Sequence, residues 1–586
     1  MTKALYSLLD EMHQTHRSTT ALFVKHMEQL YACEQLLYGE ERLVLDQETC
    51  TPVAIAAMTN NKSVKELQLY CDCIGRDEFP MFARMLHRNT TLQILGFEGF
   101  SSSCELLLSV DWSLVSIRDL YIVGSFQDSD GLKQFFKALT CNKTIKKLCI
   151  YDCGLEDDMA EDLCRIIRNG SLQELDLTIN NFTADGIESI VEAIKHSNVI
   201  DFDISHNPIG DCGVERISDL FTMKVKNLNI GDISIQNESF DVFSYCLAHS
   251  SHIESIFFQK VEFSSPAKLF MAASMAKTLT KLSFIDCAID CSNVVELAKL
   301  VSSGQLELLD LGSNNIGGKG MLLLHNAILA SKRIQDFTLS DNPLGLDGIK
   351  LLSNLLSNEN CPLKYLTVDA LLVDQTSMEI LSAGLAVNKS LISFSMEYTE
   401  FDARLFKYLF AALHKNRHLQ ELYVDGPRID NFLGSEDEPN EYFEYLQRLF
   451  MNNRSIVKMS CPMIATIEVP IVLAGLLHNY TLEWLGNVNE EYRGSSKTHG
   501  PEIEHEDIKE IAKRNKSIKQ VKLAESVLAS RALLMLELPL ELLHLIQNYL
   551  TDYAMIPLHL KAKYSRTLLK QELIGKLFTK DNVNIF

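Results

Sequence analysis

The stretch LQELDLTINNF, Leu172–Phe182, decides the fold because the chain repeats its pattern. The segments VIDFDISHNPI (199–209), LELLDLGSNNI (306–316) and IQDFTLSDNPL (334–344) carry apolar residues at the same positions 1, 4, 6 and 11, with asparagine at position 9. A constant period of roughly 20–50 residues is the mark of a stacked repeat architecture. Position 1 recurs at intervals of 25 to 29 residues, at Val64, Leu92, Ile117, Ile145, Leu172, Val199, Val225, Ile253, Leu279, Leu306, Ile334, Leu363, Leu391 and Leu419.

Each repeat is predicted to contain one short strand and one helix. Apolar residues at positions 4 and 6 alternate with polar ones, which is the period of a half-buried strand. The segment that follows, such as GIESIVEAIKHS from Gly186, has apolar residues at helical spacing. One strand and one helix cannot bury their own apolar faces, so neighbouring repeats must stack.

The pattern resembles the leucine-rich repeats of the ribonuclease-inhibitor type, L-x-x-L-x-L-x-x-N/C-x-L. The resemblance covers about residues 40–525, or about 17 units, if weaker repeats at Ile456, Leu482 and Ile518 are included. It implies an α/β solenoid, a horseshoe with a parallel sheet on the concave face and helices on the convex face. Because a stack needs covered ends, residues 1–39 are predicted to form a helical N-terminal cap and 526–586 a helical C-terminal segment.

Position 9 should stabilise the turn that follows each strand, because an Asn or Cys side chain can satisfy backbone groups there. The residue is kept at Cys153, Asn180, Asn207, Cys287, Asn314 and Asn342. It is replaced at Phe100, Ile233, Val261, Leu371 and Pro427, where irregular turns are predicted.

Two recurring motifs have structural explanations. Glycines follow the asparagine by six residues in four repeats (Gly186, Gly213, Gly320 and Gly348), so they are expected where the chain turns into the outer helix. The glycine-rich NNIGGKGM from Asn314 does not match a phosphate loop, because Lys319 precedes Gly320 and no Ser or Thr follows. Apparent glycosylation tripeptides at Asn61, Asn89, Asn142, Asn388 and Asn515 fall where a helix ends and the next strand begins.

The composition of the chain limits which cellular locations and which classes of partner we expect. The formal net charge is −22, which disfavours nucleic acid or an anionic membrane as the main partner. No apolar run reaches the length of about 20 residues that spans a bilayer, and the N-terminus lacks a secretion signal. Fifteen cysteines show neither disulfide nor zinc spacing, which indicates free thiols in a reducing compartment. We therefore expect a cytoplasmic protein without cofactor or metal.

A concave wall of this kind would be lined by the residues that flank positions 4 and 6. Carboxylates and tyrosines dominate these places, which predicts a protein-binding surface that prefers a basic partner. The same residues could instead be an ordinary solvated wall of an acidic chain. The predicted wall residues are Tyr70, Tyr121, Tyr151, Glu174, Asp176, Asp201, Asp203, Asn227, Asn229, Asp310, Asp336, Thr338, Tyr365, Asp369, Glu397, Glu421, Tyr423 and Asp425.

The segment LELPLELLHLIQNYLTDY (536–553) resembles the opening of an F-box, L-P-x-E-[IL]-[LI]-x-x-I-x-x-Y-L. The resemblance implies docking on a Skp1-like subunit of a cullin ubiquitin ligase. A short helix started by a proline could equally cap the stack. The matching residues are Leu538, Pro539, Glu541, Leu542, Leu543, Ile546, Tyr549 and Leu550.

These observations predict a non-catalytic scaffold that binds a protein through the concave face, as a ligase adaptor or as a bacterial effector acting in the host cytosol. No H-E-x-x-H, G-x-S-x-G or Walker motif is present. The alternative is an enzyme: a ubiquitin ligase with its own catalytic cysteine, or a GTPase activator that uses an arginine beside the repeats, with Arg216 or Arg428 as candidates.

Overall fold

The computed structural model describes residues 41–45, 52–70, 73–99, 104–124, 129–235, 237–397, 405–424, 438–460, 475–476, 478–486 and 515. By its internal contacts the chain divides into two compact units, Met1–Leu344 and Gly345–Phe586, called unit 1 and unit 2 below. The predicted helical caps, 1–39 and 526–586, lie outside the described residues.

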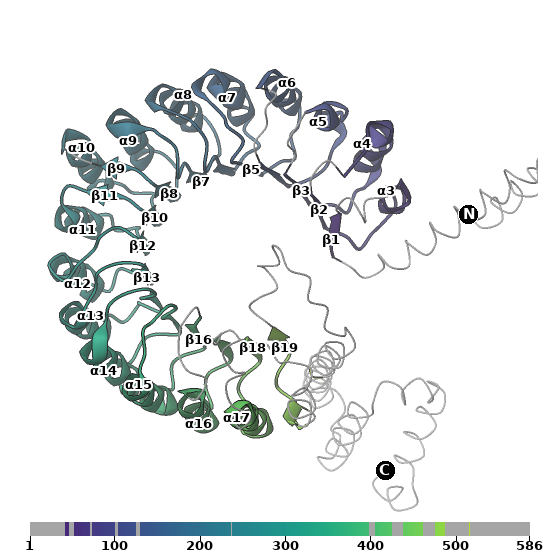
Figure 1. The fold of residues 1–586 in the computed structure, drawn as a ribbon. Coiled ribbons are helices and arrows are strands. Elements are labelled where there is room, and N and C mark those ends of the chain that lie inside the picture. The colour runs from purple at the N-terminus through teal and green to yellow at the C-terminus, as the bar shows by residue number, and fades with distance from the viewer. Residues whose placement is uncertain are drawn as a thin grey trace, which may run out of the picture. The chain divides into compact units, whose positions relative to one another are not determined.

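A parallel sheet forms the inner layer of unit 1 (Figure 1). Position 4 of each repeat faces position 4 of the next, so Leu148 pairs with Leu175, and Leu175 with Phe202. In β2 the two leucines are buried while the residues around them stay half-exposed, as the alternating pattern predicts. The paired strands follow chain order: β1 (Arg42–Leu45), β2 (Glu66–Tyr70), β3 (Ile94–Glu98), β4 (Asp119–Val123), β5 (Lys147–Tyr151), β6 (Glu174–Asp176), β7 (Asp201–Asp203), β8 (Asn227–Gly231), β10 (Ser255–Gln259), β12 (Lys281–Ile285), β13 (Leu308–Asp310) and β14 (Asp336–Thr338).

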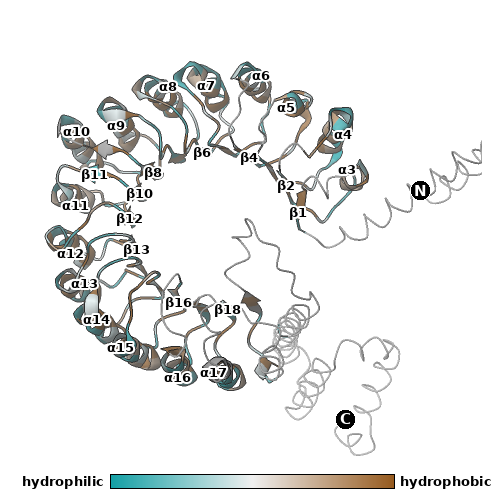
Figure 2. Ribbon diagram, in the orientation of Figure 1, coloured by the Kyte–Doolittle hydropathy of each residue, from teal (hydrophilic) through white to brown (hydrophobic). Residues whose placement is uncertain are grey.

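The helices of unit 1 form the outer layer, which confirms the predicted division between sheet and helices (Figure 1). Figure 2 shows hydrophilic and hydrophobic residues on different sides of helices such as α4. Short 3-10 turns occur at Arg76–Glu78, Trp112–Leu114, Asp157–Met159 and Asp219–Thr222. The helices are α3 (Pro52–Met58), α4 (Phe79–Arg88), α5 (Glu105–Leu108), α6 (Ser129–Leu139), α7 (Ala160–Arg168), α8 (Ala184–Lys195), α9 (Gly210–Ser218), α10 (Asn237–Ala248), α11 (Pro266–Met275), α12 (Val294–Ser302) and α13 (Gly318–Ala330).

The core lies between the two layers and runs from repeat to repeat. The ring of Phe258 lies 6.0 Å from Phe243 of the preceding repeat and 5.2 Å from Phe284 of the following one, measured between ring centroids. All three side chains are fully buried. Each repeat therefore completes the apolar surface of its neighbour, which is why a single repeat could not fold alone.

A left-handed residue at position 8 ends each strand. Its N–H donates to the position 7 carbonyl of the next repeat, as from Ile179 to Ser205 (3.0 Å) and from His206 to Gly231 (2.8 Å). This bond continues the hydrogen bonding between neighbouring repeats while the chain turns away from the sheet. Position 8 is glycine at Gly99 and Gly124, with positive φ. Elsewhere φ lies between 51° and 57°, at Asp152, Ile179, His206, Asp232, Lys260, Asp286, Ser313, Asp341 and Ala370.

The prediction of irregular turns at Ile233, Val261 and Leu371 is therefore wrong, because the residue before each keeps the same left-handed φ. The ladder between repeats, and not the side chain at position 9, sets the turn. What changes after Ile233 and Val261 is a second small sheet, in which β9 (Ser234–Ile235) pairs in parallel with β11 (Glu262–Phe263). Phe100 and Pro427 lie outside the described residues.

Position 9 has the predicted bonding role. Asn180 is buried; its oxygen accepts from Leu155 N at 3.0 Å in the preceding repeat, and its amide donates to Ile150 O at 2.8 Å. The same amide also donates to Leu177 O in its own repeat. At the equivalent place the Cys153 thiol donates to Ile122 O at 3.5 Å. A buried asparagine here links two repeats through groups that would otherwise lack partners.

The glycines lie at the start of the outer helices, as predicted, but the reason for glycine is a close contact and not a tight turn. Gly213 and Gly320 lie inside the first turns of α9 and α13 and not in a tight turn before them. A Cβ on Gly213 would lie 2.7 Å from Cβ of Ile209, and one on Gly320 would lie 2.9 Å from Cγ2 of Ile316. Glycine is required because the helix starts against the apolar residue at position 11. Gly186 and Gly348 occupy the same place in α8 and in α14 of unit 2.

The asparagines of the glycosylation tripeptides are structural, as predicted. Asn142 is buried; its oxygen accepts from Ile145 N at 3.0 Å, and its amide donates to Trp112 O at 2.8 Å. In unit 2 equivalent asparagines form a ladder, in which Asn416 donates to Asn388 O and Asn453 donates to Asn416 O. Asn89, Asn142, Asn388 and Asn515 are buried, so the folded chain cannot present these four side chains for glycosylation; Asn61 is half-buried.

Unit 2 is built in the same way. Its parallel sheet contains β15 (Tyr365–Thr367), β16 (Ser393–Met396), β17 (Glu421–Val424), β18 (Lys458–Ser460) and β19 (Trp484–Gly486). Its described helices are α14 (Gly345–Ser357), α15 (Gln375–Val387), α16 (Phe406–Lys415) and α17 (Glu438–Asn452). Within the described ranges of either unit, no helix is long and apolar enough to cross a membrane.

Candidate functional site

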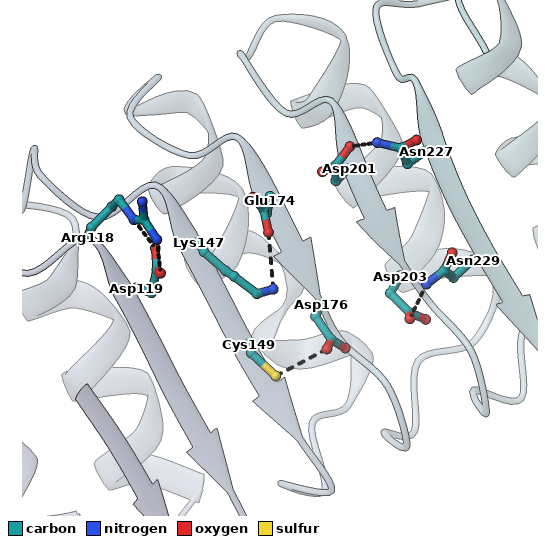
Figure 3. A network of polar contacts seen from close by, with 10 residues as sticks. All are labelled: Arg118, Asp119, Lys147, Cys149, Glu174, Asp176, Asp201, Asp203, Asn227 and Asn229. Atoms are coloured by element: carbon teal, nitrogen blue, oxygen red, sulfur yellow. Dashed lines mark hydrogen bonds and ion pairs between the residues drawn. The ribbon is translucent and has the colours of Figure 1, made fainter. Parts of the chain in front are cut away.

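Most of the predicted wall residues lie on the strands, at positions that point away from the core; Asp369 and Glu397 lie just after β15 and β16. The tyrosines Tyr151 and Tyr365 are 36% and 42% exposed, and most of the other wall residues are half-buried. Asp425 lies outside the described residues. The structure brings Glu174, Asp176, Asp201, Asp203, Asn227 and Asn229 together on the adjacent strands β6, β7 and β8 (Figure 3).

An aspartate at position 5 shapes the ends of three strands. Asp176 accepts from Thr178 N at 2.9 Å, Asp203 from Ser205 N at 2.9 Å, and Asp310 from Gly312 N at 2.9 Å. In each case the carboxylate accepts a hydrogen bond from a backbone N–H that could otherwise bond to the neighbouring strand. The strands β6, β7 and β13 are three residues long, whereas β5 and β8 have five; β14, with threonine at position 5, is equally short, so the aspartate alone does not explain the length.

Three aspartates on β6 and β7 are held by uncharged donors (Figure 3). Asn229 donates to Asp203 at 2.8 Å, Asn227 donates to Asp201, and the Cys149 thiol donates to Asp176 at 3.2 Å. None of these three aspartates forms an ion pair with any residue that the structure describes. Their negative charge is therefore fixed in position and left uncompensated. We call Asp176, Asp201 and Asp203 the acidic triplet.

Two described cations, Arg118 and Lys147, lie on the side of the triplet toward β4 and β5 (Figure 3). The Lys147 ammonium lies 3.1 Å from Glu174 and 5.5 Å from the centre of the Tyr121 ring. Burial lowers the pKa of Lys147, but the contacts with Glu174 and Tyr121 outweigh this effect and raise it to about 12. Lys147 is thus a permanent cation that neutralises Glu174. Arg118, the residue before β4, pairs in the same way with Asp119, the first residue of that strand, at 2.7 Å.

Burial makes several wall carboxylates costly to ionise. It raises the pKa of Asp201, although the hydrogen bond from Asn227 partly opposes the shift. Burial also raises the pKa of Asp310, and the pKa of Asp336 rises through burial and through the nearby charge of Asp310. A cation placed against these groups would replace the lost hydration, so the wall favours positively charged ligands.

A pocket of about 540 Å³ opens at the edge of the sheet beside the triplet. Four consecutive position 8 residues line it: Asp152, Ile179, His206 and Asp232. Nδ1 of His206 lies 3.5 Å from a carboxylate oxygen of Asp232. This pocket was not predicted from the sequence, because the residue types at position 8 vary. Position 8 can still be located in the sequence, since it immediately precedes the Asn or Cys of the repeat pattern.

The wall of unit 2 also contains hydrogen bonds between neighbouring strands. Asp369 accepts from Ser395 Oγ at 2.6 Å and from the backbone N–H of Glu397 at 2.8 Å. The Glu397 side chain accepts from Ser460 Oγ at 3.1 Å. Lys458 lies 2.8 Å from Glu421, so this wall, like that of unit 1, contains a cation paired with a carboxylate.

Most of the residues named for the alternative functions lie outside the described part of the chain. Arg216 lies on the outer helix α9, where it faces Glu188 at 3.6 Å. Arg428 lies outside the described residues, as do the F-box-like residues Leu538, Pro539, Leu542, Leu543, Ile546 and Leu550. No cluster suited to a metal ion occurs among the residues that the structure describes. All eleven described cysteines have free thiols.

Comparisons with known proteins agree with the repeat architecture. A family model described as "Leucine Rich repeat" matches residues 168–191, 195–218 and 306–324. NACHT, LRR and PYD domains-containing protein 14 of Homo sapiens is 24% identical over 364 residues, which cover 59% of this chain and 33% of that protein. Ribonuclease inhibitor of Mus musculus is 23% identical over 285 residues, 46% of this chain and 61% of that protein. Ribonuclease inhibitor of Sus scrofa is 22% identical over 283 residues, with the same coverage.

The matched region spans about a third of the human relative and less than two thirds of either ribonuclease inhibitor. The similarity therefore extends over many repeats but not over whole proteins. It agrees with the strand register, the outer helices and the asparagine at position 9 described above. The fold and these similarities together show a leucine-rich repeat architecture of the ribonuclease-inhibitor type, as the sequence predicts.

Proposed function

We propose that the chain is a non-catalytic scaffold that binds a partner protein with a basic surface, and that the inner face of unit 1 is the binding surface. The observation that carries the proposal is the acidic triplet, in which three carboxylates on neighbouring strands have only uncharged donors. Two similar relatives are named as inhibitors of ribonuclease, which is consistent with a repeat surface that holds another protein.

The geometry suits a guanidinium or ammonium group. Asn227, Asn229 and Cys149 fix the carboxylates before any ligand arrives, so a partner would lose little free energy in ordering them. A cation at this surface would form charge-assisted hydrogen bonds, which are stronger than those between neutral groups. The pocket at Asp152, His206 and Asp232 extends the same negative surface to the edge of the sheet.

The test starts with the full chain, crosslinked in a cell lysate and analysed by mass spectrometry to identify a partner. The affinity of that partner is then measured for Asp176→Asn/Asp201→Asn/Asp203→Asn. We expect a loss of at least about tenfold, and a weaker dependence on salt, because three uncompensated charges are removed. Unchanged affinity would rule out the triplet as the binding surface.

A matched control removes three charges from the outer helices of the same unit, as Glu161→Gln/Glu188→Gln/Glu192→Gln. These side chains are exposed on α7 and α8. We expect this variant to keep the partner's affinity within about twofold, since exposed ion pairs contribute little. An equal loss in both variants would mean that net charge alone, and not the inner face, attracts the partner.

We further propose that the scaffold works in the cytosol as an adaptor that presents its partner to a cullin ubiquitin ligase, or as an effector in a host cell. This proposal rests on the F-box-like sequence alone. Full-length Leu542→Asp/Ile546→Asp should lose copurification with a Skp1-like subunit while its inner-face partner stays bound. Copurification by both forms, or by neither, would reject the adaptor role and leave the scaffold proposal untouched.

A further inference from the structure

A second group of polar side chains lies on the inner face of unit 1, on the strands β12, β13 and β14. Ser283 faces Asp310 in the pairing of β12 with β13, and Asp336 lies diagonally across from Asp310 on β14. The usual spacings between strands and along a strand place the Cα atoms of the two aspartates about 8 Å apart. All three residues are at position 3 or 5 of their repeats, so they share the inner side of the sheet.

The two aspartates carry charges that their surroundings do not neutralise. Neither forms an ion pair with a residue in the described ranges. Burial raises the pKa of Asp310, and burial together with the nearby charge of Asp310 raises the pKa of Asp336, although Lys281 partly opposes this second shift. The strands β12, β13 and β14 carry only these three charged side chains, one lysine against two aspartates, which gives a net charge of −1. Two like charges are thus held close together with one exposed lysine beside them.

The hydroxyl of Ser283 is buried beside this pair. It forms no hydrogen bond of ordinary length in the described part of the chain, which is uncommon for a buried hydroxyl. It nevertheless lies close enough to Asp310 to lower the pKa of that carboxyl, so it points toward the carboxylate. A small turn of the Asp310 side chain would complete this hydrogen bond. A bound cation would favour the turn, because it requires the ionised carboxylate.

The strand register places this pair at a fixed distance from the acidic triplet. Asp203, Asn229, Phe257, Ser283 and Asp310 face one another in turn across the adjacent strands β7, β8, β10, β12 and β13. Four strand spacings separate Asp203 from Asp310, which is about 19 Å along the sheet. Phe257 is half-exposed in the middle of this row. The inner face therefore presents two acidic positions with an aromatic side chain between them.

We propose that Asp310 and Asp336, with Ser283 as a positioning residue, form a second subsite on the inner face that takes the guanidinium group of an arginine from the basic partner. This inference rests on the proposed scaffold function and adds the chemistry and the spacing of the groups that the partner presents. A guanidinium donates from a planar fork in several directions, so it suits two separate carboxylates better than a compact ammonium does. Its binding would offset the cost of ionising two half-buried groups.

The test uses labelled octa-arginine and octa-lysine, whose extended length of about 27 Å spans the triplet and the new subsite. Fluorescence anisotropy with the full-length chain at low ionic strength measures both affinities. Octa-arginine should bind at least about threefold more tightly than octa-lysine. Asp310→Asn/Asp336→Asn should weaken octa-arginine by at least about tenfold and remove this preference. Ser283→Ala should weaken octa-arginine by about threefold and octa-lysine less, because it acts through Asp310.

The matched control is Asp286→Asn/Asp341→Asn, which removes two exposed carboxylates at position 8 of the same repeats as Ser283 and Asp336. Asparagine adopts the positive φ of both positions readily, so this variant should fold. It should bind both peptides within about twofold of the unchanged chain, since exposed charges contribute little. An equal loss in the control and in Asp310→Asn/Asp336→Asn would show an effect of net charge alone and would overturn the proposal.

A second measurement separates a binding role from a structural one. Asp310→Asn should raise the free energy of unfolding while it lowers the affinity for octa-arginine, because the ionised carboxylate opposes folding but attracts the cation. A residue with only a structural role would not give this combination. If Ser283→Ala binds octa-arginine normally, the positioning role of Ser283 is overturned.

The subsite is overturned if octa-arginine does not bind the unchanged chain, or if Asp310→Asn/Asp336→Asn binds it equally well. It is also overturned if that variant weakens octa-arginine and octa-lysine by the same factor. The triplet variant Asp176→Asn/Asp201→Asn/Asp203→Asn distinguishes this failure from that of the proposed function. A loss of octa-arginine in the triplet variant alone would remove the new subsite and leave the triplet standing, and a loss in the Asp310→Asn/Asp336→Asn variant alone would do the reverse.

Discussion

The side-chain amide of Asn229 donates a 2.8 Å hydrogen bond to Asp203 on the neighbouring strand. Two strands away in the same sheet, Lys147 makes an ion pair with Glu174. Both contacts join residues of adjacent repeats, but only the second cancels a charge. The acidic surface therefore extends over the repeats in which an amide holds the carboxylate, and it ends where an ammonium group neutralises the carboxylate. In this way an otherwise regular sheet gains a specific charge pattern.

Replacing Asp310 by asparagine should stabilise the protein at neutral pH. Burial raises the folded-state pKa of Asp310, so its ionised form opposes folding. The protonated carboxyl favours the folded state relative to the ionised one. This contribution is fully present below the pKa of the unfolded state, about 3.9, and it is lost as the pH rises through the higher pKa of the folded state. Each unit of this shift corresponds to about 1.4 kcal/mol. Asparagine keeps an oxygen that can accept from Gly312 N.

Urea unfolding at about pH 7 and about pH 3.5 would measure this effect, with a gain in the free energy of unfolding expected only at the higher pH. Asp374→Asn serves as a control that should change stability in the opposite direction. Its carboxylate caps α15 and accepts from Ser377 N at 2.8 Å, which lowers its pKa. That stabilisation is present above the unfolded pKa, so Asp374→Asn should destabilise at neutral pH. A loss of stability in Asp310→Asn at neutral pH would contradict the prediction.

Asn207→Ala should destabilise unit 1 by about 2–4 kcal/mol, because it leaves several buried backbone groups without partners. The Asn207 side chain is buried; it accepts from Phe182 N and donates to three carbonyls, including Leu177 O of the preceding repeat. Asn207→Cys should cost about half as much, because Cys153 shows that a thiol at this position donates to nearby carbonyls. Equal losses in chemical denaturation would show that packing, and not hydrogen bonding, explains the residue.

The repeat pattern in the sequence was enough to predict the strands, the outer helices, the buried leucines and the bonding role of position 9. The register also follows from it, because position 5 faces position 5 in each parallel pair, as Asp203 does with Asn229. What the sequence did not show is the left-handed turn, since position 8 can be Asp, Ile, His, Ser or Ala. Its conformation comes from a hydrogen bond to the next repeat, which is a contact about 27 residues away in sequence.

The thiols should differ sharply in reactivity. Burial raises the pKa of Cys149 and Cys153, and it raises the pKa of Cys287 to about 12, so none of them forms the reactive thiolate near neutral pH. Cys141 and Cys212 are exposed. In the native chain at about pH 8, iodoacetamide should label Cys141 and Cys212 and leave the three buried thiols unmodified until denaturant is added. Peptide mass spectrometry would read the sites, and rapid native labelling of Cys149 would contradict the described packing.

Ile179→Asn should stabilise the protein, although it removes an apolar side chain. Ile179 is β-branched and has a φ of 53°, a conformation that costs an L-residue about 1–2 kcal/mol and that asparagine adopts more readily. Its side chain is only half-buried at the edge pocket, so the substitution loses only part of the free energy that burying an isoleucine side chain would provide. The expected gain is about 1 kcal/mol in the free energy of unfolding. Ile187→Asn in α8, where the side chain is fully buried in helical backbone, should instead destabilise strongly. If Ile179→Asn lowers the melting temperature, contacts of Ile179 in the pocket outweigh the backbone strain, and the turn is held by that side chain.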